Sequence, residues 1–262
     1  MKSEIIFPSP DKNVILTGKN LTIEDFISVT RKGARVNIAD SAIDKLRKSN
    51  IIVNEIVESQ KPTYGINTGF GELSNVSVKK ESIDKLQENL ILSHCTAVGN
   101  PYPTEVVRGM MLLRANALCN GYSGIRPLVV QTIIDMLNAG VHPIIPEKGS
   151  LGSSGDLAPL AHMVLPLIGY GEAEYKGATM SGAIAMKKAG LTPCKLGAKE
   201  GLALVNGTQA MTSVGALSYY DTLHAARLAD IACSLTMEAL EGLKNAFDAR
   251  VHAVRPHQAK AS

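Results

Sequence analysis

The sequence predicts a mainly α-helical protein, with a small mixed region of short strands near the N-terminus followed by a bundle of long helices. Apolar residues recur at helical spacing over long stretches, as at Leu228, Ile231 and Leu235. No proline interrupts the chain between Gln209 and Pro256, whereas the strand signals are short. With 262 residues, of which 45% are hydrophobic, the chain can bury a sizeable core.

Short, mixed elements are expected first along the chain. Residues 14–16 (VIL) favour a strand, and Thr22 with Asp25 begins a short helix, since a threonine side chain can cap a helix N-terminus. Asp40 is expected to cap a longer helix. The apolar positions of that helix are Ile43, Leu46, Ile52, Val53 and Ile56.

Helices are expected through the rest of the chain. Ile83, Leu86, Leu90 and His94 share one face of a helix that ends before Gly99. Further expected elements are helices over roughly 103–119, 126–139 and 156–168, a hairpin over 170–177 and a helix from 209 to 247.

The last of these helices is too long and too rich in alanine to hide its apolar stripe inside a small domain. It therefore belongs in a multi-helix bundle formed by several subunits. We divide the chain into residues 1–200, which carry the functional loops, and residues 201–262, which begin the helical bundle.

Composition excludes several classes of function. The 27 basic and 24 acidic residues form no basic stripe with interleaved aromatics, so nucleic acid is not an expected partner. The four cysteines show no C-x-x-C pair and are expected to be buried free thiols in a reducing cytoplasm. Histidines lack metal-ligand spacing. Residues 1–8 contain no apolar run long enough for a secretory signal, so export is not expected. The uncharged stretch 201–220 contains too many polar residues for a membrane span and predicts a buried bundle helix.

The most informative run covers residues 149–162 (GSLGSSGDLAPLAH). Gly155 lacks a Cβ, so its backbone nitrogen can approach a carbonyl group closely, and Ser154 can lose water. The triplet Ser153, Ser154 and Gly155 can therefore cyclise and dehydrate into an electrophile. The alternative is an ordinary glycine- and serine-rich loop that ends in a helix cap at Asp156.

Two further runs carry polar groups in tight loops. Residues 63–71 (TYGINTGFG) place the Tyr64 phenol among three glycines, and no Gly-Lys-Ser/Thr follows that would make a phosphate-binding loop. Residues 199–208 (KEGLALVNGT) place Asn206 next to a glycine. Separately, each run could be structural: a turn packed over a tyrosine in the first case and a turn or helix cap in the second.

Together the three runs resemble the signatures of the aromatic amino acid ammonia-lyases. The resemblance implies a mainly α fold with the long-helix bundle of the aspartase/fumarase-like type. It also implies a 4-methylidene-imidazol-5-one cofactor formed autocatalytically from Ser153, Ser154 and Gly155, with Tyr64 as general base and Asn206 bonding substrate or cofactor. The family usually has alanine where this chain has Ser153, whose side chain lies outside the new ring.

The pair Ser93-His94 bears on the substrate, and both residues are expected on the buried helix face with Ile83, Leu86 and Leu90. A histidine on an apolar helix face is commonly a core residue, but the corresponding pair in the family lines the side-chain pocket. Ser-His resembles the histidine-specific members, whereas tyrosine- and phenylalanine-specific members carry His-Leu and Phe-Leu. The resemblance thus implies non-oxidative deamination of L-histidine to trans-urocanate and ammonia, in histidine catabolism, by a cytoplasmic homotetramer.

The length of the chain supports a rival reading. Family members continue for roughly as long again, and the tail after Arg255-Pro256-His257 departs from the family pattern. In the family, the second half supplies the arginine that holds the substrate carboxylate. The chain could therefore be a truncated or non-catalytic subunit that is poorly active alone. A phenylalanine or tyrosine ammonia-lyase, or an aminomutase, is a weaker alternative.

Overall fold

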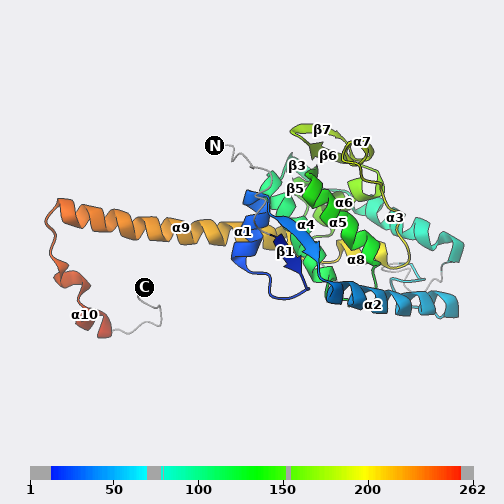
Figure 1. The fold of residues 1–262 in the computed structure, drawn as a ribbon, viewed down its shortest axis with the longest axis horizontal. Coiled ribbons are helices and arrows are strands. Elements are labelled where there is room, and N and C mark those ends of the chain that lie inside the picture. The colour runs from blue at the N-terminus through cyan, green and yellow to red at the C-terminus, as the bar shows by residue number, and fades with distance from the viewer. Residues whose placement is uncertain (1–12, 70–77, 79, 152–154, 255–262) are drawn as a thin grey trace. The chain divides into compact units, whose positions relative to one another are not determined.

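The computed structural model describes residues 13–69, 78, 80–151 and 155–254, and helices predominate in them (Figure 1). Contacts divide the chain into two compact units, residues 1–217 and residues 218–262. The division after residue 200 that the sequence suggests follows motifs rather than contacts, and it stays a prediction.

The described elements are mostly helices of moderate length. The α-helices are α1 Ile23–Lys32, α2 Asp40–Ser59, α3 Ile83–His94, α4 Thr104–Leu118, α5 Pro127–Ala139, α6 Leu157–Val164, α7 Gly182–Lys188, α8 Glu200–Val205, α9 Gln209–Ala239 and α10 Ala249–Ala253. Short 3-10 helices are η2 Lys80–Ser82, η3 Pro166–Ile168 and η4 Lys244–Phe247. The strands are β1 Asn13–Leu16, β2 Arg35–Ile38, β3 Val98–Pro101, β4 Val141–Pro143, β5 Pro146–Lys148, β6 Glu172–Tyr175 and β7 Ala178–Ser181.

The strands form small sheets at the margins of the first unit. β1 and β2 pair in parallel, β3 pairs with β5 antiparallel, and β4, β6 and β7 form an antiparallel sheet. A hairpin is present as predicted, but β7 lies beyond the predicted range 170–177. β6 and β7 are joined by Lys176 and Gly177, which both have positive φ angles. Positive φ at both central residues is typical of the turns that close two-residue hairpins.

Helix starts follow local chemistry where a cap is present. At α1, Thr22 Oγ1 accepts from the Asp25 N–H at 3.1 Å while an Asp25 carboxylate oxygen accepts from the Thr22 N–H, so the predicted start is confirmed as a capping box. The prediction that Asp40 caps α2 is wrong. Ala39 occupies the cap position without a side-chain bond, and Asp40 lies in the first turn, where its charge is favourable to the helix dipole.

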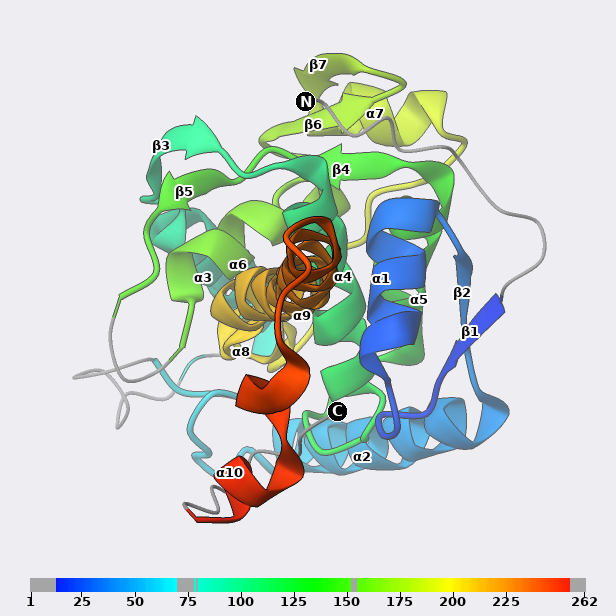
Figure 2. The same ribbon diagram turned by 90° about the vertical axis from the view of Figure 1, so that its left-hand side faces the viewer.

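The core of the first unit lies around α4, which packs against α1 and α5 (Figure 2). Gly109 marks a close crossing: a Cβ there would stand 2.2 Å from Ser213 Oγ and 2.7 Å from the Phe26 ring. Ser213 Oγ also donates to the Val106 carbonyl at 2.8 Å. The small residue at 109 thus allows α1 and the start of α9 to pack against the same side of α4.

The C-terminal helix is shorter than expected and its outer residues are uncovered. A continuous helix to residue 247 is wrong: α9 ends at Ala239, where Glu241 has a positive φ and the Gly242 N–H donates to the Met237 carbonyl at 2.7 Å. Within residues 218–254, Leu228, Ile231 and Leu235 are 64%, 56% and 65% exposed.

The uncharged stretch 201–220 also differs from its predicted form. It is divided between α8 and the start of α9 by Asn206, Gly207 and Thr208 rather than forming one buried helix. None of the helices in the described ranges is long and apolar enough to cross a membrane.

Candidate active site

Gly155, the last residue of the predicted cofactor triplet, lies directly against the turn that contains Asn206. Its φ is +104°, and a Cβ added to it would stand 2.3 Å from the Gly207 carbonyl oxygen. The next residue, Asp156, donates its N–H to that same oxygen at 2.6 Å. The structure thus brings together two runs that are 50 residues apart in sequence. Ser153 and Ser154 lie outside the described residues.

Asp156 connects this loop to α9 rather than capping its own helix. It occupies the cap position of α6 but makes no side-chain bond there. Its fully buried carboxylate accepts instead from Ser150 Oγ and, at 3.0 Å, from the Met211 N–H in the first turn of α9. Burial, followed by the charge of Asp156, raises the pKa of the Tyr102 phenol. Asp156 therefore does bond the N-terminus of a helix, as the capping interpretation expects, but the helix is α9 and not α6.

The loop that carries Tyr64 packs on α8. A Cβ on Gly65 would stand 2.5 Å from Leu202 Cδ2, and the φ of Gly65 is +77°. Asn67 is buried and closes the loop, because its Oδ1 accepts from the Thr63 N–H at 2.8 Å and its Nδ2 donates to the Lys61 carbonyl at 3.0 Å. The side chain of Tyr64 is 55% exposed, so the phenol is accessible to a ligand from this loop.

Asn206 ends α8 and presents its amide to solvent. Its N–H donates to the Leu202 carbonyl at 3.1 Å, which holds the backbone, while its side chain is exposed. Within the described part of the chain that side chain has no hydrogen-bond partner. An exposed amide on a fixed backbone can both donate to and accept from a bound ligand.

The pair Ser93-His94 lies in the last turn of α3 and is less buried than predicted. Ser93 is exposed and His94 half-buried, whereas Ile83, Gln87, Leu90 and Ile91 form the buried face. At about 100° per residue, Ser93 lies at the margin of that face and His94 near its centre. The expectation that both lie on the buried face is therefore wrong for Ser93.

The His94 ring has a defined donor and a defined acceptor. Its Nδ1 lies 2.8 Å from the Leu90 carbonyl oxygen and 3.1 Å from Ser93 Oγ, whose own hydrogen is donated to that carbonyl. Both neighbours therefore act as acceptors, which assigns the hydrogen to Nδ1. In the neutral ring, Nε2 is then left as an acceptor. The segment that follows α3 lies against the glycine-rich loop, because a Cβ on Gly149 would stand 2.6 Å from Ala97 Cβ.

Three polar side chains with no predicted role, Glu200, Gln87 and Arg114, hold α8 in place. The buried Glu200 carboxylate accepts from the Arg126 N–H, from the Arg126 guanidinium at 2.6 and 2.8 Å, and from the Gly197 N–H. Gln87 Oε1 accepts from the Gly201 N–H at 3.0 Å. Arg114 donates to the Ala203 carbonyl. The sequence feature that could have pointed to these contacts is a charged or amide side chain at an otherwise apolar helix position.

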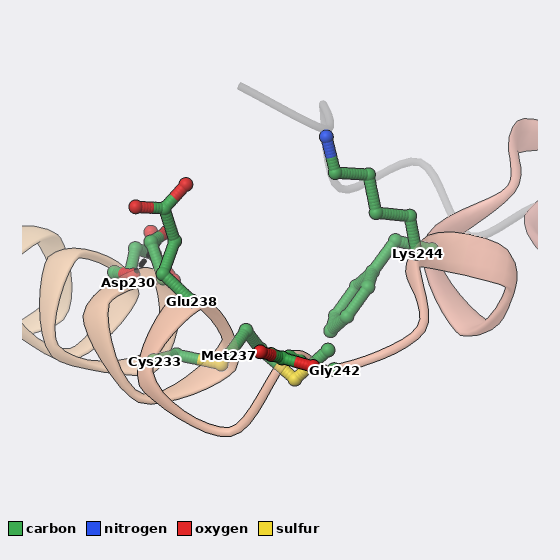
Figure 3. A pocket seen from close by; sticks show the side chains of 9 residues that line it. Asp230, Cys233, Met237, Glu238, Gly242 and Lys244 are labelled. Carbon is green, nitrogen blue, oxygen red and sulfur yellow. Dashed lines mark hydrogen bonds between the residues drawn. The ribbon is translucent and has the colours of Figure 1, made fainter.

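Away from these loops, the described residues offer little that resembles a site. A cavity of about 850 Å³ lies at the end of α9, and its lining includes Cys233, Met237 and Lys244 (Figure 3). None of its residues belongs to the motifs. No cluster of histidine, cysteine or carboxylate side chains in the described ranges could hold a metal ion.

The cysteines are free, as expected, but differ in exposure. Cys119 is buried, Cys95 and Cys194 are half-buried, and Cys233 is exposed. Burial raises the pKa of each of the first three to about 11. The expectation of buried thiols therefore holds fully for Cys119, only in part for Cys95 and Cys194, and is wrong for Cys233.

Comparison with known proteins identifies close relatives. Residues 21–262 match the family model of the aromatic amino acid lyases. The chain is 56% identical to the histidine ammonia-lyase of Clostridium tetani over 94% of its own length and 48% of that protein. The chain thus spans about half the length of the curated relatives it matches.

Solved structures agree on the fold and differ in the activity they are named for. The histidine ammonia-lyase of Trypanosoma cruzi has a TM-score of 0.87 at 38% identity, with 94% of this chain and 48% of that chain covered. The tyrosine aminomutase of Streptomyces globisporus has a TM-score of 0.88 at 37% identity, with 94% and 47% covered. The shape of the chain therefore does not discriminate between substrates.

Proposed function

This chain belongs to the aromatic amino acid lyase family, and we propose that it carries the N-terminal half of a histidine ammonia-lyase. The complete protein would convert L-histidine into trans-urocanate and ammonia. The observation that carries the proposal is the packing of the Tyr64 loop and the Gly155 loop on α8 and on the turn that follows it. That packing supports a common site for three runs that are separate in sequence.

The described residues fit a ring formed from the triplet 153–155. Ring closure joins the Gly155 nitrogen to the Ser153 carbonyl carbon and releases one water, and loss of the Ser154 hydroxyl releases a second. Gly155 meets the steric demand, because its positive φ and the Gly207 carbonyl leave no room for a side chain. The resulting methylidene group would supply an electrophile for the substrate.

The roles of the surrounding side chains follow from their chemistry and exposure. Tyr64 would take the proton from the substrate β-carbon, as a phenol held on a packed loop can once its proton is lost. Asn206 would bond the substrate or the prosthetic group through its exposed amide. Both side chains extend from backbone that is fixed by buried neighbours, which supports precise placement.

His94 supports an imidazole-bearing substrate. Its Nε2 acceptor matches the ring N–H of histidine, which a phenyl ring lacks. If a bound phenyl ring covered this acceptor, it would stay unpaired, and that cost would disfavour phenylalanine. Phenylalanine or tyrosine deamination and the aminomutase reaction remain the alternative activities, and the likeness to a tyrosine aminomutase is the observation in their favour.

The isolated chain is expected to be a poor catalyst. Misplacement of a reacting group by about 1 Å can reduce the rate about a hundredfold, and the family places the carboxylate-binding arginine outside this part of the sequence. We further propose a homotetramer that assembles through long helices and works in the cytoplasm. The exposed apolar residues of α9 support assembly.

The test is an absorbance assay for urocanate on the complete protein, on the 262-residue chain alone, and on this chain co-expressed with the remaining half. Activity is expected in the first and third preparations. In the complete protein, histidine should be consumed far faster than phenylalanine or tyrosine. His94→Leu should reduce histidine turnover by more than its change in the unfolding midpoint explains. Equal turnover of the three amino acids would contradict the assignment of histidine as the substrate. Full activity of the chain alone would contradict the proposal that this chain holds only part of the active site.

A further inference from the structure

Arg114 lies beneath the turn that follows α8, although it belongs to the middle of α4. Its side chain is 5% exposed. Its Nη1 donates to Gln209 Oε1 at 3.1 Å, and its Nη2 donates to the Ala203 carbonyl. One guanidinium thus bonds the residues on both sides of the turn, at the end of α8 and at the start of α9.

The turn between these two bonds carries Asn206 and the Gly207 carbonyl against which Gly155 lies. A Cβ on Gly207 would stand 2.3 Å from Arg114 Nη1, so the guanidinium packs against the turn itself. On its other side, the Gly207 carbonyl oxygen accepts from the Asp156 N–H and contacts Gly155. Any movement of the turn therefore changes both the Asn206 backbone and the surface against which Gly155 lies.

Burying an arginine with only these partners costs free energy, so stabilising the fold does not by itself explain Arg114. Burial lowers the pKa of the Arg114 guanidinium to about 10, because desolvation penalises its charge. No carboxylate lies within ion-pair distance of Arg114 among the described residues, and its Nε has no acceptor there. An apolar side chain of similar volume would fill the space without these costs, but could not hold a carbonyl and an amide at fixed places.

We propose that Arg114 is a positioning residue of the active site, which fixes the Asn206-Gly207 turn in the place that Gly155 and Asp156 require. It does not touch substrate and acts through the turn. This inference rests on the proposed function for its effect on catalysis, but the positioning itself concerns residues of this chain alone.

Arg108 provides a matched control on the same helix. It is also buried, with a pKa that burial lowers to about 10. Its guanidinium donates to the Val29 and Leu137 carbonyls and to His142 Nε2. These partners lie on α1, α5 and β4, which carry none of the motif residues. Loss of a buried guanidinium in general can therefore be separated from loss of this one.

The experiment compares Arg114→Met, Arg114→Lys and Arg108→Lys in the complete protein. The measurements are the mass of the peptide that contains residues 153–155, the kcat and KM for histidine, the unfolding midpoint, and the hydrogen exchange of the Asp156 amide. Arg114→Met should leave much of the peptide unmodified, lower kcat at least tenfold and speed the Asp156 exchange at least tenfold. Arg114→Lys should restore part of each. Arg108→Lys should lower the midpoint and leave the other three values unchanged.

Several results would overturn the proposal. One is a folded Arg114→Met protein with a fully modified peptide, an unchanged kcat and an unchanged Asp156 exchange rate. Another is a loss in all three variants that simply follows the unfolding midpoint. If Arg114→Met fails to fold, an unchanged kcat and exchange rate in Arg114→Lys decides against it.

Failure of the proposed function would look different. The unsubstituted protein would then lack both the modified peptide and urocanate formation. The Asp156 exchange rates of the Arg114 and Arg108 variants would still decide whether Arg114 holds the turn.

Discussion

The environment of α8 and the outer part of α9 differ in how completely their side chains are partnered. Around α8, the buried Glu200 carboxylate has several donors, Gln87 bonds a backbone N–H, and glycines allow loops to pack at contact distance. From residue 218 to residue 254, large apolar side chains such as Leu228 and Leu235 are more than half exposed. The geometry of the first region is therefore fixed by contacts within this chain. The second region presents an exposed apolar surface, which is typical of an interaction site.

The largest loss of activity is expected from a substitution at Gly155, where the environment of α8 leaves no room for a side chain. Gly155→Ala places a Cβ on the Gly207 carbonyl oxygen in a backbone conformation with φ of +104°. In the complete protein, this change should abolish the loss of two waters from the peptide that contains residue 155 and reduce urocanate formation at least a hundredfold. Peptide mass spectrometry and the absorbance assay measure these outcomes.

Gly177→Ala is the matched control, since it also has a positive φ but no atom within 4 Å of the added Cβ. It should cost about 1 kcal/mol of stability and leave activity unchanged. Equal losses in the two variants would show that the Gly207 contact is not the cause.

Acid should weaken the first unit through His142. Burial, together with the Arg108 charge, lowers the pKa of His142 to about 3, below its ordinary value of 6.5. The unfolded chain binds a proton to this ring as the pH falls below about 6.5 and the folded chain does not, so the stability contribution present at neutral pH is lost between about pH 6.5 and 3. The free energy of unfolding should fall by up to about 1.4 kcal/mol per pH unit from this group.

The measurement is urea unfolding at several pH values, with His142→Gln as the comparison. The difference in slope between the two proteins isolates the contribution of the ring from that of the carboxylates. Identical slopes would mean that His142 is protonated in the folded state as readily as in the unfolded chain.

The smallest effect on stability is expected in the uncovered region. Replacing Leu228, Ile231 and Leu235 by serine should change the free energy of unfolding by less than about 0.5 kcal/mol per residue, because exposed side chains contribute little. The same variant should nevertheless reduce self-association, which sedimentation measures. Leu128→Ser, at a 59% exposed position on α5, controls for the loss of an exposed leucine. An unchanged sedimentation profile in the triple variant would contradict assembly through α9.

The parts of the fold that depend on residues close together in the sequence could be predicted. The capping box of Thr22 and Asp25 is set by local chemistry and is confirmed. The hairpin is present too, but its turn at Lys176 and Gly177 ends the predicted range 170–177 and its second strand lies beyond it. The end of α9 was missed although Gly242 signals it, because the apolar spacing continues beyond the break. Local patterns report what the backbone can adopt more reliably than where an element stops.

The arrangement of the candidate site could be predicted only as a set of residues. Tyr64, Gly155 and Asn206 are marked by their surrounding glycines. The contacts that hold their loops join residues far apart, as between Gln87 and Gly201 or between Arg126 and Glu200. Such pairs have no spacing signature. The exposure of Ser93 was also misjudged, because the pair Ser93-His94 was placed on one face although helical periodicity puts only His94 near its centre.

The unequal exposure of the cysteines makes the chain suitable for selective chemical labelling. A thiol reacts as the thiolate, so the three thiols whose pKa burial raises to about 11 should react slowly near neutral pH. Cys233 is exposed on the outer part of α9. A fluorophore on this thiol would stand on the surface that assembly is expected to cover. Its emission would then follow the encounter of chains in time, without any substitution in the protein.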